Sequence, residues 1–134
     1  MIEPQGNVRP VVLIADDDDD ILQLLAFRLE RAGYEIVQAR NGKQALSLAL
    51  ELLPALAVLD VMMPELDGYE VTRELRTNEA TSSMPIILLT ARAQTQDAAR
   101  GLAVGADDYV KKPFDARDLR ERIERLLRLR LVGP

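Results

Sequence analysis

The stretch Val-Leu-Asp-Val-Met-Met-Pro-Glu-Leu-Asp-Gly, residues 58–68, decides the fold. Its first residues continue the apolar run Ala55-Leu56-Ala57, which is typical of a strand buried on both faces. Pro64 and Gly68 then mark a loop that leads to the next helix. Asp60 consequently lies at the carboxyl end of a buried strand. In open α/β sheets, that edge is where ligands bind and chemistry takes place.

The rest of the chain repeats the order strand, loop, helix. Short apolar or β-branched runs predict strands, and apolar residues three or four apart predict helices. The strict alternation, with short connections, predicts a parallel sheet covered by helices on both faces. The predicted strands are 11–15, 34–39, 55–60, 86–90 and 109–110. The predicted helices are 21–32, 44–53, 66–77, 95–104 and a last one capped by Asp115. Their inward positions are Ile21, Leu25, Leu29 and Ala32, then Ala45, Ala49 and Leu52, then Val71 and Leu75, then Ala99, Leu102 and Ala103, and finally Leu119, Ile123, Leu126 and Leu127.

The composition narrows the chemistry of the chain. Its 134 residues, 48% hydrophobic and 29% charged, predict a single soluble globular domain. The sequence has no Cys and no His, which excludes disulfides, zinc clusters, thiol catalysis and Ser-His-Asp hydrolysis. Carboxylates, hydroxyls and lysines remain, the set that metal-assisted phosphoryl chemistry uses. The net charge of -5 and the short apolar runs predict no direct nucleic-acid binding, no membrane association and a cytoplasmic location.

Polar side chains follow the predicted strands at the points where they end. Asp16 and Asp17 follow the first strand, Asp60 ends the third, Thr90 ends the fourth and Lys112 follows the fifth. Because the carboxyl ends of parallel strands share one edge, we expect these residues to gather there. Like charges within ~4 Å repel by several kcal/mol, so the three acids need cations among them. Mg²⁺, a hard ion that prefers oxygen ligands, and the Lys112 ammonium would supply that charge.

A phosphoryl group would use every residue of this predicted site. The Asp60 carboxylate can act as the nucleophile and form an aspartyl phosphate. The metal and Lys112 would neutralise the phosphoryl oxygens, and the Thr90 hydroxyl could donate a hydrogen bond to one of them.

These motifs, taken together and in order, resemble the receiver domains of bacterial two-component response regulators. The likeness covers about residues 11–130 and implies a flavodoxin-like (βα)5 doubly wound sheet with strand order 2-1-3-4-5. Residues 1–9 are then a loose leader, 10–131 the receiver and 132–134 a tail or truncated linker. The motifs are Asp16-Asp17, Val58 to Pro64 with Asp67-Gly68, Leu88-Leu89-Thr90-Ala91, and Gly105 to Tyr109 leading to Lys112-Pro113-Phe114.

The resemblance implies a role for each acidic residue. Asp60 is the phosphoacceptor, which receives the phosphoryl group from the phosphohistidine of a sensor histidine kinase or phosphotransfer protein. Mg²⁺ is bound by Asp17, Asp60 and the backbone carbonyl of Met62, with Asp16 acting through a metal-bound water. The Lys112-Pro113 peptide bond is expected to be cis. The chain then catalyses only its own phosphorylation and dephosphorylation, and it is not an enzyme in the usual sense.

The resemblance also implies a conformational switch made by Thr90 and Tyr109. Phosphorylation would remodel the face formed by helix 95–104, strand 109–110 and the last helix, and so control an output. Receivers of the winged-helix transcription-regulator class are the nearest likeness, and they dimerise through this face. A homodimer is therefore a further hypothesis. Its expected cross-dimer pairs are Arg122 with Asp108 and Arg100 with Glu121.

Plainer interpretations stand beside these. Asp18 to Asp20 need no function, since acids are favoured in the first turn of a helix. Thr90, Lys112 and Tyr109 could be ordinary strand-end, surface and core residues. The six arginines between Arg117 and Arg130 could belong to a solvated helix face. Two other functions remain open: a constitutive protein-binding module that has lost phosphorylation, and a phosphohydrolase with an aspartyl nucleophile, although Met62 stands where such enzymes often carry a second acid.

Overall fold

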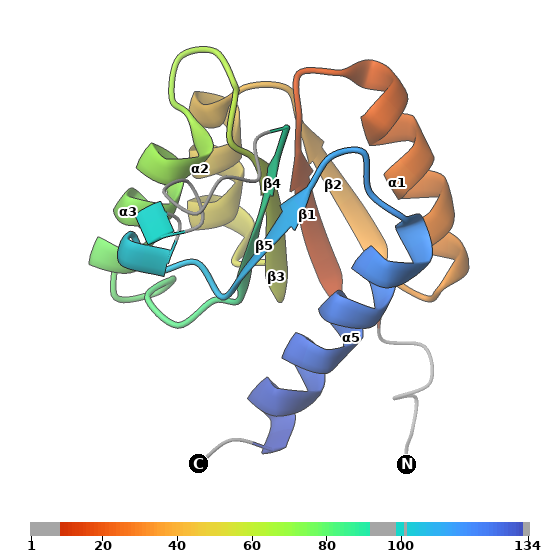
Figure 1. The fold of residues 1–134 in the computed structure, drawn as a ribbon. Helices are drawn as coiled ribbons and strands as arrows, with labels where there is room; N and C mark the ends of the chain where they lie inside the picture. Colours follow the sequence, from red (N-terminus) through yellow and green to blue (C-terminus); the bar gives the residue numbers. More distant parts are fainter. Residues whose placement is uncertain (1–8, 92–98, 101, 133–134) are drawn as a thin grey trace.

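The computed structural model describes residues 9–91, 99–100 and 102–132, and its centre is a five-stranded parallel sheet (Figure 1). The strand order is β2-β1-β3-β4-β5, and every pairing is parallel, so the predicted topology is confirmed. The strands are β1 (Val11–Ala15), β2 (Glu35–Ala39), β3 (Leu56–Asp60), β4 (Ile86–Thr90) and β5 (Asp108–Lys111).

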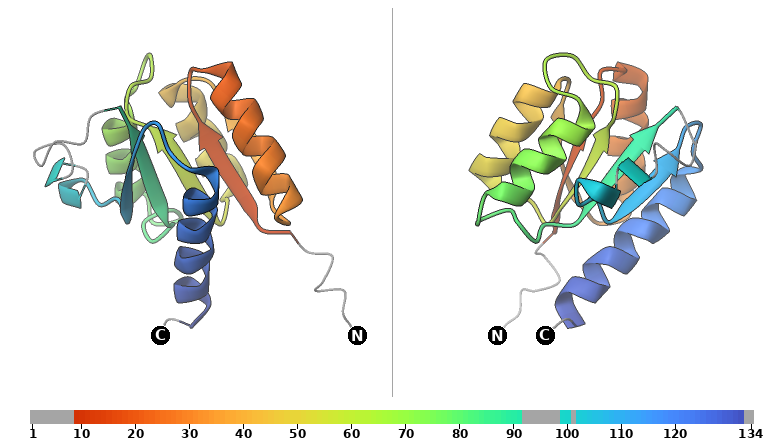
Figure 2. Two further views of the ribbon diagram at one scale, coloured as in Figure 1. Left: turned by 45° about the vertical axis from the view of Figure 1, so that its right-hand side comes forward. Right: turned by 60° about the vertical axis from the view of Figure 1, so that its left-hand side comes forward.

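Helices cover both faces of the sheet (Figures 1 and 2). One face packs against α2 (Gly42–Leu52) and α3 (Gly68–Thr77), and the other against α1 (Asp19–Arg31) and α5 (Ala116–Val132). Every residue of β3 and β4 is buried, as their continuous apolar runs predicted. The pleat sends neighbouring side chains to opposite faces, so each face has its own apolar core.

Helix α1 begins earlier than the apolar spacing predicted. The side chain of Asp18 caps it by accepting hydrogen bonds from the backbone N–H groups of Asp20 and Ile21, at 2.9 and 3.4 Å. Asp19 and Asp20 lie in its first turn, in agreement with the helix-start interpretation of these acids. The inward stripe differs slightly, because Leu22 is fully buried whereas Ile21 is only partly so.

Helix α2 corrects one predicted core residue. Ala45 and Ala49 are fully buried, as predicted, but Leu52 is 47% exposed. The helix ends at Leu52, and Leu53 turns into the left-handed conformation at φ 49°. The side chain of Leu52 therefore does not pack on the sheet, although its helical spacing predicted an inward position.

Helix α3 starts two residues later than predicted. Asp67 and Glu70 form a capping box, in which each side chain accepts a hydrogen bond from the other residue's backbone N–H, at 2.8 and 2.9 Å. This reciprocal cap defines Asp67 as the residue before the first helical turn. Val71 and Leu75 are buried, as predicted.

Helix α5 agrees with its predicted cap and core. The Asp115 carboxylate accepts a hydrogen bond from the backbone N–H of Arg117 at 2.8 Å. Leu119 and Ile123 are fully buried, and the two leucines that follow pack partly against the same core. Figure 2 shows α5 continuing past the edge of the sheet.

The predicted leader falls largely outside the described residues, and the predicted helix 95–104 is described only in part. Ala99, Leu102 and Ala103, which the apolar spacing predicted to point inward, are exposed, so this part of the core prediction is wrong. Residues 99, 100, 102 and 103 are helical, whereas 92–98 and 101 are not described. The same applies to residues 1–8 and 133–134. Within the described part of the chain, no helix is long and apolar enough to cross a membrane.

Arg76 ties α3 to the segment before β5. Its guanidinium donates hydrogen bonds to the carbonyls of Met84 at 2.7 Å and Gly105 at 2.9 Å, and it pairs with Asp107 at 3.0 Å. The same Asp107 oxygen accepts the backbone N–H of Ile86 at 2.8 Å. One side chain on α3 therefore satisfies acceptors on two other segments, the one before β4 and the one before β5.

We expect Arg76→Met to destabilise the fold by about 2 to 3 kcal/mol, because it leaves several partly buried acceptors without a charged donor. Arg73→Met is the matched control: Arg73 is exposed on the same helix, one turn earlier. Urea denaturation would measure the free energy of unfolding of both variants. Equal stabilities would show that water replaces the guanidinium without cost.

Candidate functional site

Asp16 and Asp17 lie directly after β1, but their side chains differ in burial. Asp16 is fully buried, and its backbone N–H donates to the carbonyl of Ala39 at 3.1 Å. Its Oδ1 accepts the backbone N–H of Asp18 at 3.0 Å, which also positions the cap of α1. Asp17 is exposed. Among five consecutive acids, the first is thus a buried strand-end residue, and the second faces the open edge.

Asp60 ends β3 and is only 3% exposed. The next residue, Val61, donates its backbone N–H to the carbonyl of Leu89 at 2.8 Å, which holds the end of β3 against β4. A Cβ at Gly68 would lie 2.6 Å from the carbonyl oxygen of Asp60. Gly68 is therefore required for this close approach, a role beyond the loop signal that the sequence showed.

Lys112 joins the two buried acids. Its backbone N–H donates to the carbonyl of Thr90 at 2.6 Å, and its ammonium lies 2.9 Å from Asp16 Oδ2 and 3.2 Å from Asp60 Oδ1. The Lys112-Pro113 peptide bond is cis, as expected. Three residues from three separate strand ends thus meet at one edge of the sheet.

The three acids could hold a metal ion. Oxygen atoms of Asp16, Asp17 and Asp60 lie within 4.8 Å of one another. Asp16 Oδ2 is buried and forms an ion pair with Lys112, but it accepts no well-oriented hydrogen bond within the described residues. A hard divalent ion with oxygen ligands, such as Mg²⁺, fits this set. The Met62 backbone is close, with its N–H 3.4 Å from Asp60 Oδ1, whereas its side chain is 63% exposed.

The environment of Asp60 favours the protonated form of its carboxyl group. Burial, and next the charge of Asp16, raise the pKa of Asp60 to about 6, although Lys112 and the Met62 N–H act in the opposite direction. Burial also acts to lower the pKa of Lys112, but its hydrogen bonds and charge interactions with Asp16 and Asp60 outweigh that effect, so the net pKa is raised. The raised pKa of Lys112 keeps its ammonium positively charged. The raised pKa of Asp60 means that the groups around it do not fully stabilise the negative charge of its carboxylate.

This pKa predicts a pH dependence of stability when Mg²⁺ is removed. The pKa of Asp60 is about 6 in the folded state against an ordinary 3.8, so the folded state binds its proton more tightly. The stability that this group contributes is complete below about pH 4 and is lost as the pH rises through 6, by about 3 kcal/mol at most. Urea denaturation in EDTA should show this loss for the wild type but not for Asp60→Asn. Parallel curves for the two proteins would contradict it.

Thr90 and Tyr109 differ in how closely they approach the edge of the site. Thr90 is the last residue of β4 and is only 2% exposed. Tyr109 lies within β5, is half-buried, and packs against the core on the α2 and α3 face. Their role as a switch stays a prediction.

One expected cross-dimer pair forms within the chain instead. The Arg122 guanidinium contacts both carboxylate oxygens of Asp108, at 2.8 and 3.0 Å, because α5 packs back beside the start of β5. Arg100, expected to pair with Glu121 of another copy, lies over the ring of Tyr69 at 4.3 Å. The sequence also predicted an i,i+4 pair between Arg122 and Asp118, which forms. That spacing gave no indication that Arg122 also contacts Asp108 of β5.

Known proteins match most of this chain in sequence. The family model described as the response regulator receiver domain matches residues 12–124. The DNA-binding dual master transcriptional regulator RpaA of Synechocystis sp. is 44% identical over 119 residues, which are 89% of this chain and 49% of RpaA. The phosphate regulon transcriptional regulatory protein PhoB of Pseudomonas aeruginosa is 42% identical over 127 residues, 95% of this chain and 55% of PhoB. The chain thus spans about half the length of these relatives.

Solved structures agree on the fold. The receiver domain of the Francisella response regulator 1452 matches with a TM-score of 0.85 and 37% identity, covering 90% of this chain and 98% of that one. The chemotaxis response regulator CheY4 of Vibrio cholerae matches with a TM-score of 0.84 and 31% identity, covering 89% and 99%. The chain, with its acids and lysine gathered at the carboxyl edge of a 2-1-3-4-5 sheet, belongs to the response regulator receiver domain family.

Proposed function

We propose that this receiver accepts a phosphoryl group on Asp60 from the phosphohistidine of a sensor histidine kinase or phosphotransfer protein, and so controls an output. The observation that carries the proposal is the position of Asp60: a buried carboxylate 3.2 Å from the Lys112 ammonium, beside two further acids. Residues 10–131 form the receiver unit in this proposal. The intact acid and lysine set argues against a binding module that has lost phosphorylation.

Attack on phosphorus is assigned to one oxygen of Asp60. Lys112 and the Met62 N–H both contact Oδ1, so Oδ2 is the atom that forms the new O–P bond as the P–N bond to the donor histidine breaks. The carboxylate is the nucleophile, and no general base is required. Mg²⁺, bound by Asp17, Asp60 and the Met62 carbonyl and by Asp16 through a water molecule, would supply positive charge to the phosphoryl oxygens.

Lys112 and Thr90 stabilise the transferring group. Loose phosphoryl-transfer transition states spread negative charge over three oxygens, so a fixed ammonium beside them lowers the barrier. The Thr90 hydroxyl would donate a hydrogen bond to a phosphoryl oxygen. The backbone N–H of Lys112 donates a hydrogen bond to the carbonyl of Thr90, the last residue of β4, so the two groups are held next to one another.

The response of the chain is a shift between two conformations. Thr90 and Tyr109 would form the switch, and the face made by the predicted helix 95–104, β5 and α5 would contact the output or a second copy. A shift from 1:99 to 99:1 requires about 5.5 kcal/mol of preference for the active state, and partial switching requires less. Two named relatives are transcriptional regulators, so an output in transcription is part of the proposal.

Intact-mass spectrometry after incubation with acetyl phosphate tests the proposal. With Mg²⁺, the chain should gain about 80 Da, the mass of one phosphoryl group. In EDTA, the gain should disappear, because the acids then lack their neutralising ion. A gain of equal size in EDTA would exclude the proposed metal site, and turnover of many phosphoesters per chain would favour a phosphohydrolase.

A further inference from the structure

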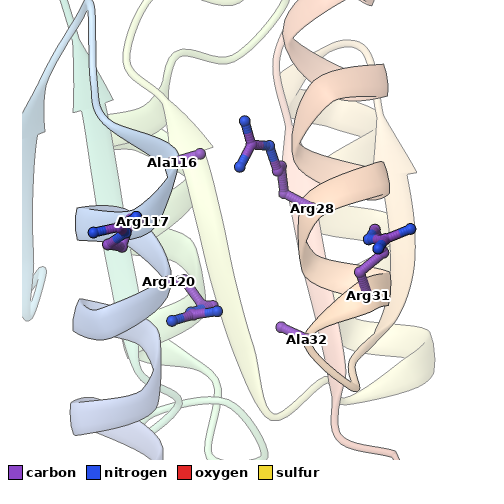
Figure 3. A pocket seen from close by; sticks show the side chains of 6 residues that line it. All are labelled: Arg28, Arg31, Ala32, Ala116, Arg117 and Arg120. Carbon is purple, nitrogen blue, oxygen red and sulfur yellow. The ribbon is translucent and has the colours of Figure 1, made fainter.

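A cleft between α1 and α5 is lined by arginines from both helices (Figure 3). Its volume is about 580 Å³, and Ala32 and Ala116 leave room between the helices. Figure 3 shows Arg28 extending from α1 into this space toward Ala116. The arginines that line it are Arg28, Arg31, Arg117 and Arg120.

Most of this positive charge is not neutralised. Arg28 and Arg117 have no ion-pair partner among the described residues, and Arg31 lies over the ring of Phe27 at 5.3 Å. Arg120 has Glu124 at 3.6 Å, with both side chains partly exposed. Four exposed arginines thus line one cavity in a chain whose net charge is -5. In Figure 3 the Arg28 guanidinium lies within the space, whereas those of Arg31 and Arg117 point outward from their helices.

The helix dipole accounts for only half of the cluster. Arg28 and Arg31 lie in the last turn of α1, where cations are favoured. Arg117 lies in the first turn of α5, where the positive end of the dipole disfavours a cation. The Asp115 carboxylate already accepts the backbone N–H of Arg117, and the Arg117 side chain, which has only donors, adds nothing to the cap of α5. A ligand that brings negative charge would remove this penalty.

We infer that the cleft between α1 and α5 binds a di- or triphosphate group, either free or carried by a nucleotide. Guanidinium groups bind phosphate oxygens through two parallel hydrogen bonds, and several of them match the several charges of a polyphosphate. The volume is in the range of small-ligand sites. A cleft of this size on an acidic chain favours a small anion over duplex nucleic acid, because the negative charge of the rest of the surface would repel a long polyanion.

Binding can be measured by titration of the full chain in EDTA with inorganic tripolyphosphate, ATP, adenosine or orthophosphate. EDTA keeps Mg²⁺ from recruiting phosphates to the acid cluster at Asp60. Calorimetry gives the affinity, and ¹H–¹⁵N spectra of arginine Nε–H groups locate the ligand. We expect saturable shifts at Arg28 and Arg117, with tripolyphosphate tighter than orthophosphate and adenosine silent. Equal affinities for tripolyphosphate and ATP would identify the phosphate chain as the ligand, and tighter ATP a nucleotide.

The double variant Arg28→Gln/Arg117→Gln should weaken tripolyphosphate binding roughly tenfold or more, because two charged forks are lost. The control Lys43→Gln/Arg73→Gln removes the same charge from exposed positions on α2 and α3, and it should change affinity less than about twofold. The variant Arg28→Lys/Arg117→Lys retains the positive charge but loses the paired N–H donors of the guanidinium groups. Its affinity for tripolyphosphate should lie between those of the wild type and the Gln pair. Equal losses in the Gln pair and the control, unchanged Nε–H signals of Arg28 and Arg117 at saturating tripolyphosphate, or tighter binding of a DNA duplex through these arginines would overturn the inference.

Discussion

Asp60→Asn is expected to abolish the Mg²⁺-dependent mass gain of about 80 Da on incubation with acetyl phosphate. The amide has nearly the shape of the carboxylate, so the buried position at the end of β3 is retained. It lacks the negative oxygen that attacks phosphorus, and therefore the loss should be complete. Intact mass measured over time for wild type and variant gives the comparison directly.

Glu65→Gln is the matched control for this substitution. Glu65 is exposed in the loop after β3, where it lines a cavity together with Asp17, and its change likewise removes one negative charge near the site. It should leave the mass gain unchanged. A modified Asp60→Asn protein would place the acceptor on another residue and remove the central assignment of this site.

Lys112→Met should slow phosphorylation by acetyl phosphate roughly 100-fold or more at saturating Mg²⁺. The ammonium lies within 3.2 Å of both buried carboxylates, so it is placed to neutralise the phosphoryl group as charge develops. Loss of one preorganised donor of this kind typically costs ~10²–10³ in rate. The rate of appearance of the phosphorylated mass measures the effect.

Lys111→Met is a stringent control, because it removes the same charge one residue earlier in the chain. Lys111 is exposed at the end of β5 and has no ion pair among the residues the structure describes. It should phosphorylate at nearly the wild-type rate. If both variants slowed equally, general surface charge rather than the fixed contact with Asp60 would be responsible.

The local pattern of the sequence determined the fold class. Short continuous apolar runs are typical of strands buried on both faces of a sheet, and their alternation with helical spacing leaves few topologies other than the one observed. The positions of Asp16, Asp60, Thr90 and Lys112 at strand ends followed from the same pattern, since parallel strands share their carboxyl edge.

The periodicity of apolar residues predicted the ends of the helices less accurately than it predicted the helices themselves. Leu52 had the spacing of a core residue, yet it is exposed because the helix ends there. Helix α3 starts two residues later than predicted because Asp67 and Glu70 form a capping box. Only the contacts between these side chains and the backbone show that the capping box forms. Apolar spacing reports the direction of a side chain, not whether a surface lies opposite it.

Long-range pairing was decided by tertiary structure alone. Arg122 contacts Asp108 across the α5–β5 packing, Arg76 bridges three segments, and Gly68 is required by a carbonyl eight residues earlier. The arginine cleft between α1 and α5 likewise joins residues more than eighty positions apart in the sequence. A sequence specifies which residue types occur and how they repeat locally, whereas distances between remote side chains arise only when helices pack on the sheet.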